Sequence, residues 1–531
     1  MNKIVNKLFL TGFFLCGCQN NSLDQKKQSL HVNIHSEPTT LDPRKSHDIP
    51  SIHVVRMCFE GLMRKNDEGQ PQPAIAESVE ILNQNRTYVF HLRESRWSDG
   101  TPLTAYDFEE TWKTILSPSF PTGTALDFYI IKNAKAVKEG KLPSDALGLK
   151  VLDDKTLQVE LERPVPYFLN LISSSAFSPI PRHIEKINPR WADNAGDSFV
   201  GNGPFKMKSW QHQNAILLEK NPLYWESQSV VLEEIHLTMV EDETTELSMF
   251  ESGELDWSGS PLSSLPTDAL QALKKQNRLL TFPIAGVYYY VFNVSKPPFN
   301  NANLRKALAL SINRKLIIEN ITQSRQQPAL GYVPPLLWEK KESNYFSDAD
   351  LVEAKRLFEL ALKELDLTRE KFPTITLSYN TTLAHHVIAQ AVQDQWLQTL
   401  GIRVRLENKE WKVFLDELAH GQFQVARLGG IANFHDPMSF LETFRYKDHF
   451  SNYSTWINDA FCALIERAEN TLDIHERETI LRQAEAILME EMPVIPIYFY
   501  TGSYLKKPYV KGVYLSDLSD IDLKTAYIES K

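Results

Sequence analysis

Four side chains able to bind a charged ligand lie close together in the segment VARLGGIANFHDPMSFL, residues 425–441. Arg427 offers a guanidinium and Asn433 an amide. His435 and Asp436 add an imidazole and a carboxylate. A guanidinium donates charge-assisted bonds to a carboxylate, whereas amide and carboxylate oxygens accept from an ammonium. The set predicts either a ligand site or a polar surface loop, and the elements around it decide between the two.

The surrounding pattern places this segment at the edge of a sheet. From Pro373 the chain alternates three strands with two helices, Leu383–Leu400 and Trp411–His420, each followed by glycine. Such βαβαβ alternation predicts a mostly parallel sheet, whose ligands bind beyond the carboxyl ends of its strands. The third strand is expected to break at the glycine pair 429–430, with a helix restarting beyond Pro437. The loops at this edge are 379–385, 408–411 and 429–436.

Other patterns predict the elements that support the site. Thr104 and Asp107 have the spacing of a helix capping box. Apolar residues at helical spacing predict helices at 303–321 and 348–365, which would cover the sheet. A domain boundary is expected near Phe282, before a strand that ends in two prolines.

The sequence lacks the usual motifs of enzymes. No G-x-S-x-G, H-E-x-x-H or G-x-x-x-x-G-K-S/T pattern occurs. His385 and His386 are adjacent, so they point to different sides of a helix, and no Cys or carboxylate pattern completes a metal shell. The acidic runs 241–243 and 490–491 are typical of a solvated surface. We therefore expect no catalytic residue, metal or cofactor, and an exported hydrolase with an unmarked site is the remaining enzymatic alternative.

Length and composition narrow the class of protein. The chain has 531 residues, which exceeds one ordinary hydrophobic core and predicts at least two domains. Its 42% hydrophobic and 23% charged residues are typical of a soluble globular protein. A formal charge of −10 without a basic stripe argues against nucleic-acid binding. Cys58 and Cys462 permit one disulfide, and the sequence leaves their pairing open.

The N-terminus has the pattern of an export signal. Lys3 and Lys7 precede the apolar run Leu8–Leu15, which is too short to span a bilayer. The run ends in Leu-Cys-Gly-Cys, which resembles the bacterial lipobox, so Cys18 is expected to be lipidated after removal of the signal peptide. An ordinary signal peptide is the alternative. We expect an exported protein that a lipid anchors to the periplasmic face of the cytoplasmic membrane.

Several segments together resemble the periplasmic oligopeptide-binding proteins of ABC importers, family 5 of the extracytoplasmic solute-binding proteins. The resemblance runs in order from about His31 to the C-terminus. The segments include EPTTLDPRKSHDIPSIHVVRMCFEGL, WSDGTPLTAYDF, VPYFLNLISSSAFSPIP, GNGPFKMKSWQHQNAILLEKNPLYW, PPFNNANLRKALALSINR and MPVIPIYFYTGSYLKKPYVKG.

The resemblance implies a fold and a role. The fold would be an α/β, two-lobed clamshell with an additional domain and a cleft between the lobes. The role would be capture of an extended oligopeptide and delivery to an ABC permease with its ATPase subunits, by a monomer without a cofactor. The implied bounds, after a signal at 1–18, are 31–59 with 184–284 and 501–531 for lobe I, 60–183 for the additional domain, and 285–500 for lobe II.

The resemblance also implies site residues. Arg427, His385 and Trp411 match positions that line the peptide site, with Arg427 and His385 available to a ligand carboxylate. A buried place at the start of a helix is the alternative for Trp411. Ile49 matches a position whose backbone pairs with the peptide. Tyr288 and Tyr290 match a tyrosine-rich strand that borders the cleft.

The segment at 425–441 departs from the family pattern. Asn433 stands where the family has the aspartate that pairs with the α-ammonium of the peptide, and His47 stands where it has an acidic residue. Asp436 is a candidate substitute for the missing charge. Gly430 replaces a family tryptophan, which predicts a larger or differently shaped pocket.

These changes leave three ligand hypotheses open. The first is a peptide whose amino end is blocked, displaced or differently charged, such as a cell-wall or γ-linked peptide, because a desolvated ammonium without a counter-ion is costly. The second is a conventional oligopeptide. The third is a non-peptide solute such as nickel or haem. A surface adhesin or chaperone-like protein is the alternative outside transport.

Overall fold

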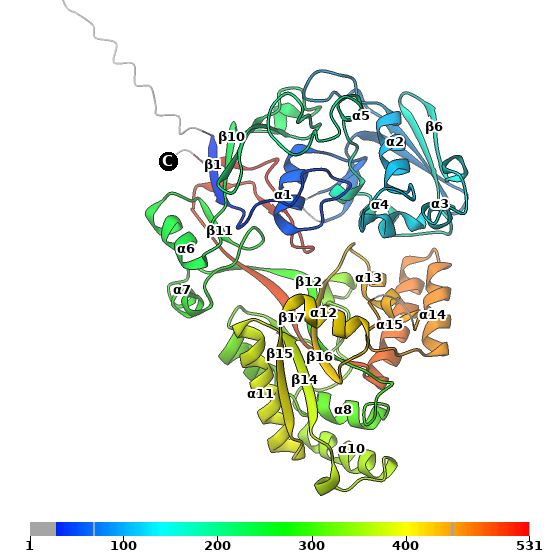
Figure 1. Cartoon of the computed structure of the whole chain (residues 1–531), viewed down its shortest axis with the longest axis vertical. Helices are drawn as coiled ribbons and strands as arrows, with labels where there is room; N and C mark the ends of the chain where they lie inside the picture. The colour runs from blue at the N-terminus through cyan, green and yellow to red at the C-terminus, as the bar shows by residue number, and fades with distance from the viewer. Residues whose placement is uncertain (1–27, 67–68, 448–450, 530–531) are drawn as a thin grey trace, which may run out of the picture.

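The structure is a computed structural model that describes residues 28–66, 69–447 and 451–529. Within these ranges the chain forms two bodies joined by long strands, drawn one above the other in Figure 1. The expected lipidation site, Cys18, lies outside the described residues.

One mixed sheet runs through both bodies. Its strand order in the described residues is β15-β14-β16-β12-β17-β11-β1-β10-β9-β8, with β13 beside β17. The strands are β1 Ser29–Asn33, β8 Phe205–Gln211, β9 Ala215–Lys220, β10 Glu234–Thr238, β11 Trp257–Gly259, β12 Leu280–Phe292, β13 Gln327–Pro328, β14 Ile375–Asn380, β15 Val404–Lys409, β16 Val425–Ile431 and β17 Val494–Lys506.

The two longest strands of this sheet connect the bodies. β12 and β17 run antiparallel, and their pairing shifts register between Pro283 and Val287 (Figure 1). A register shift interrupts the ladder of hydrogen bonds and lets a strand bend. The expected bounds between lobe I and lobe II, at 284/285 and 500/501, fall at this irregularity and stay a prediction.

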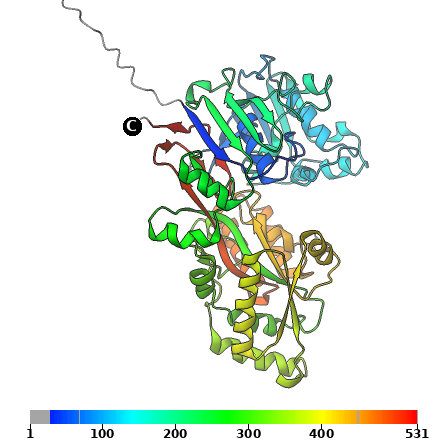
Figure 2. The same cartoon turned by 60° about the vertical axis from the view of Figure 1, so that its left-hand side comes forward.

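Segments from both ends of the chain build the upper body. β1 pairs in parallel with β10, and the Ile528 amide donates to Gln28 Oε1 at 2.9 Å. Figure 2 shows the C-terminal segment, in red, beside β1, in blue. The helices here are α1 Ile49–Cys58, α6 Glu243–Ser252, α7 Leu270–Lys275 and the 3-10 helices η4 Ser227–Ser229 and η5 Thr267–Ala269. The small ladders are β2 Met63–Lys65 with β3 Pro71–Pro73, β18 Val510–Lys511 with β21 Tyr527–Ile528, and β19 Tyr514–Leu515 with β20 Ile521–Asp522.

A second sheet lies inside residues 60–183, the range expected for the additional domain. Its order is β4-β5-β7-β6, with β4 Ala76–Leu82, β5 Thr87–Leu92, β6 Leu149–Asp153 and β7 Thr156–Glu160. The predicted capping box is present, because the Thr104 amide donates to Asp107 Oδ2 at 2.8 Å. The helices are α2 Ala105–Ile115, α3 Ala134–Lys138, α4 Phe168–Leu171, α5 Arg182–Glu185 and the 3-10 helices η1 Thr124–Ile130, η2 Ser144–Ala146 and η3 Ser175–Phe177.

The predicted βαβαβ unit is confirmed in the lower body. β14 pairs in parallel with both β15 and β16, whereas the next strand, β12, is antiparallel to β16, so the parallel part has three strands. α11 ends at Gly401, whose positive φ of 74° suits a glycine after a helix. The helices here are α8 Ala302–Leu310, α9 Arg314–Ile317, α10 Leu351–Glu364, α11 Leu383–Leu400, α12 Trp411–Ala419, α13 Met438–Leu441, α14 Asp459–Glu469, α15 Ile474–Glu491 and the short helices η6 Ile318–Thr322, η7 Pro335–Leu337, η8 Arg369–Lys371 and η9 Glu442–Phe444.

The prediction of one helix over residues 303–321 is wrong. α8 ends at Leu310, and Asn313 starts the next helix by accepting from the Leu316 amide at 3.0 Å. A capping side chain favours a helix start, so the polar Ser311 and Asn313 divide an apolar pattern that looked continuous.

Candidate functional site

Arg427 is half-buried, and its guanidinium contacts only neutral groups among the described residues. Its Nη1 donates to Asn380 Oδ1 at 3.4 Å and its Nη2 to the Tyr500 hydroxyl at 3.1 Å. The guanidinium carbon lies 4.4 Å from the centre of the Tyr288 ring. Its Nε is buried and has no partner among the described residues. A cation held by neutral groups is ready to pair with a carboxylate from outside the chain.

His385 stands beside Arg427, as the sequence predicts. It lies in the first turn of α11, and its Nδ1 is 3.4 Å from the Tyr288 hydroxyl. Burial, and then the nearby charge of Arg427, lower the pKa of His385 to about 3. His385 is therefore neutral at pH 7 and offers a hydrogen bond rather than a second positive charge. His386 faces elsewhere, with its Nδ1 2.5 Å from the Tyr379 hydroxyl.

Tyr288 and Tyr290 lie behind this pair rather than at the surface. Their side chains are 1% and 0% exposed, and their rings pack edge to face. Tyr290 pairs with Arg427 across the β12/β16 ladder. In this structure the two tyrosines support Arg427 from the core, and neither ring is open to a ligand.

The prediction that the third strand breaks at residues 429–430 is wrong. β16 continues through both glycines to Ile431 and pairs there with β12. A Cβ at Gly429 would overlap the Tyr500 hydroxyl, so this glycine permits the close approach of a side chain rather than a turn. A Cβ at Gly430 would meet nothing closer than Phe440 Cε1 at 3.8 Å, so this position has free space. The predicted helix beyond Pro437 is confirmed as α13.

Substituting Gly429 with alanine is expected to destabilise the fold by about 1–3 kcal/mol, the usual cost of overpacking. The new methyl group would displace the Tyr500 hydroxyl, which also accepts from Arg427. Thermal denaturation checks this result. Gly430→Ala is the matched control and should change stability by less than about 0.5 kcal/mol. Equal melting temperatures for the two variants would contradict the packing argument.

Asn433 lies beyond the end of β16 and lines a large cavity. The cavity has a volume of about 1110 Å³, and side chains from two parts of the chain line it, among them Asp127 and Tyr167 from the first and Phe434 and Arg445 from the second. The backbone amide of Asn433 donates to Ser439 Oγ at 2.8 Å. The side chain of Asn433 is exposed. Tyr167 and Phe434 stack between these two parts of the chain, with ring centres 4.1 Å apart. Asn433 therefore faces space that both parts enclose.

Asp436 is not free in this structure. Its Oδ2 and Oδ1 accept from Arg477 Nη1 and Nη2 at 2.7 and 2.9 Å, and both side chains are buried. Its Oδ1 also accepts from the Met438 amide at 2.9 Å. The neighbouring His435 contacts Asp517, with Nδ1 and Oδ2 2.5 Å apart. The geometry assigns Asp436 to fixing the 431–438 loop, which argues against the hypothesis that it replaces the charge absent at Asn433.

Ile49 and Trp411 are exposed. Ile49 is 59% exposed at the start of α1, where Asp48 Oδ1 accepts from the Ser51 amide at 2.9 Å. Trp411 is 49% exposed at the start of α12, so the alternative of a buried residue at a helix start is wrong. The structure brings Arg427 and His385 together, whereas Ile49 belongs to the upper body and Trp411 starts α12, just after β15.

Sequence reasoning missed the cavity wall that residues before position 172 provide. Leu126, Tyr129 and Tyr167 line the same cavity as Asn433. Arg163 joins this wall to α14, with its Nε 2.9 Å from Glu469 Oε1. No local motif marks these residues, because only tertiary packing brings them to residue 433.

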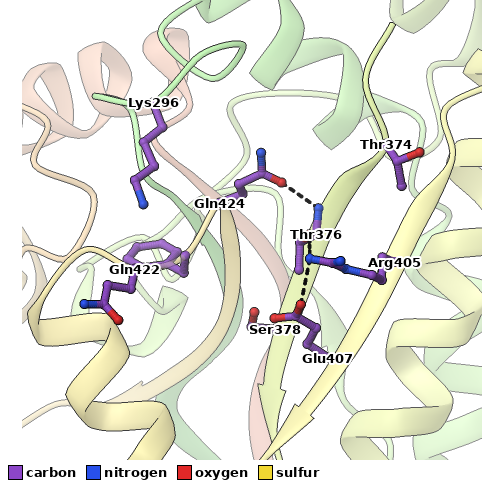
Figure 3. Close-up of a pocket in the computed structure, with 9 residues that line it drawn as sticks. Lys296, Thr374, Thr376, Ser378, Arg405, Glu407, Gln422 and Gln424 are labelled. Atoms are coloured by element: carbon purple, nitrogen blue, oxygen red, sulfur yellow. Dashed lines mark hydrogen bonds and ion pairs between the residues drawn. The ribbon is translucent and has the colours of Figure 1, made fainter.

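A smaller hollow of about 470 Å³ lies at the opposite, amino ends of the same strands (Figure 3). Its polar groups largely pair with one another. Arg405 Nη2 lies 2.8 Å from Glu407 Oε1, and the Thr376 amide donates to Gln424 Oε1 at 2.7 Å. Because Arg405 is already paired with a carboxylate, this hollow is a weaker candidate for binding a ligand carboxylate than the Arg427 site.

The described residues contain no group of three or more His, Cys, Asp and Glu side chains that could hold a metal ion. No helix in the described ranges is long and apolar enough to cross a membrane. Cys58 is buried and Cys462 half-buried, and both are free thiols.

Comparison with known proteins gives a consistent result. Residues 70–452 match the model for bacterial extracellular solute-binding proteins, family 5. The oligopeptide-binding protein OppA of Bacillus subtilis (strain 168) is 42% identical over 507 residues, which cover 95% of this chain and 93% of that protein.

Several solved structures match 95% of this chain, and two of them illustrate the likeness. The unliganded open form of the murein tripeptide binding protein MppA has a TM-score of 0.81, 31% identity and 98% coverage of its own chain. Haemophilus influenzae OppA in complex with RPPGFSPFR has a TM-score of 0.77, 30% identity and 99% coverage. These likenesses confirm the expected fold class, an α/β, two-lobed binding-protein clamshell.

Proposed function

Because the chain belongs to the family 5 bacterial extracellular solute-binding proteins, we propose that it captures oligopeptides in the cleft between its lobes and delivers them to an ABC permease and its ATPase subunits. The names of its relatives, which bind oligopeptides or a murein tripeptide, support this role. The chain would act as a monomer and would hydrolyse nothing.

The observation that carries the proposal is the guanidinium of Arg427, which no carboxylate balances in the described part of the chain. A peptide ends in a carboxylate, and an arginine fork binds a carboxylate through two charge-assisted hydrogen bonds. His385 adds a neutral hydrogen-bonding group beside it. The exposed Trp411 and the backbone near Ile49 complete the site in this proposal, as an apolar wall and a partner for the peptide backbone.

The proposal includes where the protein acts and how it moves. Cys18 would carry the lipid that holds the mature chain at the periplasmic face of the cytoplasmic membrane. Lobe I, the additional domain and lobe II would have the bounds expected from the sequence. The interrupted pairing between β12 and β17 would allow the lobes to open and close.

A second candidate is a peptide with a modified or displaced amino end. Asn433 favours it, because an amide lacks the ionic attraction that an aspartate would offer to an α-ammonium. The likeness to a protein named for a murein tripeptide also supports it.

The test uses the chain without residues 1–18 and an equimolar library of tripeptides, in free and Nα-acetylated forms. Equilibrium dialysis with mass spectrometry should find tripeptides retained at one per protein and no cleavage products after prolonged incubation. Retention of no peptide in either form would overturn the proposed function, and cleavage would overturn the expectation of a pure binding protein.

The Asn433→Asp variant discriminates the two candidates. It should raise affinity for free-amine peptides by about tenfold, because it adds a charge-assisted hydrogen bond worth about 1.5–3 kcal/mol, part of which desolvation offsets. It should leave the affinity of acetylated peptides unchanged, which calorimetric titration measures. Equal gains for both forms would show that residue 433 does not contact the amino end.

A further inference from the structure

We propose that Asp127, on the additional domain, supplies the counter-charge for the amino group of the bound peptide that Asn433 does not supply. The inference rests on the proposed function and names the group that selects one end of the ligand. The favoured ligand is then a peptide whose cationic amino group lies past the end of β16, in the cavity between the additional domain and lobe II.

Asp127 shares a cavity with Asn433. It lies in η1 and lines the same cavity of about 1110 Å³. Its side chain is half-buried. In the described ranges its carboxylate takes part in no hydrogen bond or ion pair. A half-buried carboxylate without a partner is costly, and a ligand cation would satisfy it.

Cations near Asp127 are engaged with other carboxylates. Burial alone raises the pKa of Asp127 to about 6, with no contribution from a neighbouring cation. The two arginines of the cavity are already paired. Arg163 Nε lies 2.9 Å and Arg445 Nη1 2.7 Å from the same oxygen, Oε1 of Glu469. Lys141 is paired as well, with its Nζ 2.7 Å from Glu139 Oε2. Asp127 is therefore a carboxylate of the cavity that neither arginine nor Lys141 neutralises.

Part of the cavity wall is apolar. Tyr129, Tyr167 and Phe434 give it aromatic surfaces, and Leu126 adds an aliphatic one. An ammonium reaching this cavity would meet the Asp127 carboxylate beside these aromatic and aliphatic side chains, whereas an acetylated amino end would gain only the apolar contact.

The test compares wild type with Asp127→Asn on the tripeptide that the library screen retains most. Calorimetric titration at pH 7.0 should show that the variant binds the free-amine peptide at least about tenfold more weakly, since a hydrogen bond to a charged group is worth about 1.5–3 kcal/mol. The acetylated form should change by less than about twofold. Asp145→Asn is the matched control, because this carboxylate of the same domain is 93% exposed. It should bind both peptides as wild type does.

The pH dependence gives an independent readout. Asp127 is ionised above its pKa of about 6, so its attraction for an ammonium is full near pH 7 and is lost as the pH falls through 6. Wild type should bind the free-amine peptide about tenfold more weakly at pH 5.0 than at pH 7.0. The Asp127→Asn variant should lose this dependence. The comparison is needed because other titratable or charged groups line the cavity: Tyr129, Lys135, Glu139, Lys141, Glu162, Arg163, Tyr167, Glu442, Arg445 and Tyr446.

The outcomes separate the inference from the proposed function. If wild type binds the free-amine peptide and Asp127→Asn binds it equally well, the inference is wrong and the proposed function stands. If wild type binds only acetylated peptides, the inference is also wrong, and the hypothesis of a ligand with a blocked amino end is supported. If wild type binds no peptide in either form, both fail. A melting temperature for Asp127→Asn within about 2 °C of wild type shows that the variant is folded.

Discussion

Replacing Arg427 with glutamine is expected to weaken binding of a tripeptide with a free carboxylate by about 100-fold. The loss corresponds to about 2.7 kcal/mol, within the range for truncating one partner of a buried charge pair. The reason is local: among the described residues only neutral groups bind the guanidinium, so the ligand would supply its anionic partner. Glutamine keeps a donor but removes the charge and the fork.

The amidated form of the same tripeptide makes this prediction specific. Wild type should bind the amide about as weakly as Arg427→Gln binds either form, because the two changes remove the same ion pair. Arg405→Gln is the matched control, since this arginine lies in lobe II at the opposite ends of the strands and pairs with Glu407. An equal loss for the acid and the amide in Arg427→Gln would mean that Arg427 shapes the fold rather than binding the carboxylate.

Replacing Asp436 with asparagine is expected to destabilise the protein by about 3–5 kcal/mol. Removing one partner of a buried ion pair leaves the other charge unpaired, and Arg477 has both of its terminal nitrogens bound to Asp436. Urea denaturation measures the change in the free energy of unfolding. The double variant Asp436→Asn with Arg477→Met should recover most of the loss, because it removes both charges.

The same variant tests whether Asp436 binds the amino end of a peptide. Where Asp436→Asn is folded, its ratio of affinities for free-amine and acetylated peptides should equal that of wild type. A variant with wild-type stability that loses affinity for the free amine alone would show that Asp436 is the anchor, against the geometry described above.

The sequence predicted well where one local signal decides the structure. The glycines at 401 and 421 mark where two helices end, and the Thr104–Asp107 cap marks where one begins, because caps and positive φ angles are local requirements. Placing Arg427 and His385 together also succeeded, since the carboxyl ends of neighbouring parallel strands meet at one edge.

The sequence was a poor guide to the role of a residue where that role depends on a partner far away along the chain. The glycine pair at 429–430 resembles a turn, yet Tyr500, about seventy residues later, explains why Gly429 must be small. Asp436 looked like a free carboxylate until Arg477 on α15 was placed beside it. Asp127 shares no local pattern with Asn433, because the two residues lie about three hundred positions apart and only the folded chain brings them to one cavity.

A crystal structure of the complex with the tripeptide that the library screen retains most would show directly how the ligand is held. We expect an extended peptide between the lobes, with its carboxylate on Arg427 and its amino group within hydrogen-bonding distance of Asp127. A peptide bound elsewhere, or one in the cleft with its carboxylate away from Arg427, would contradict this expectation.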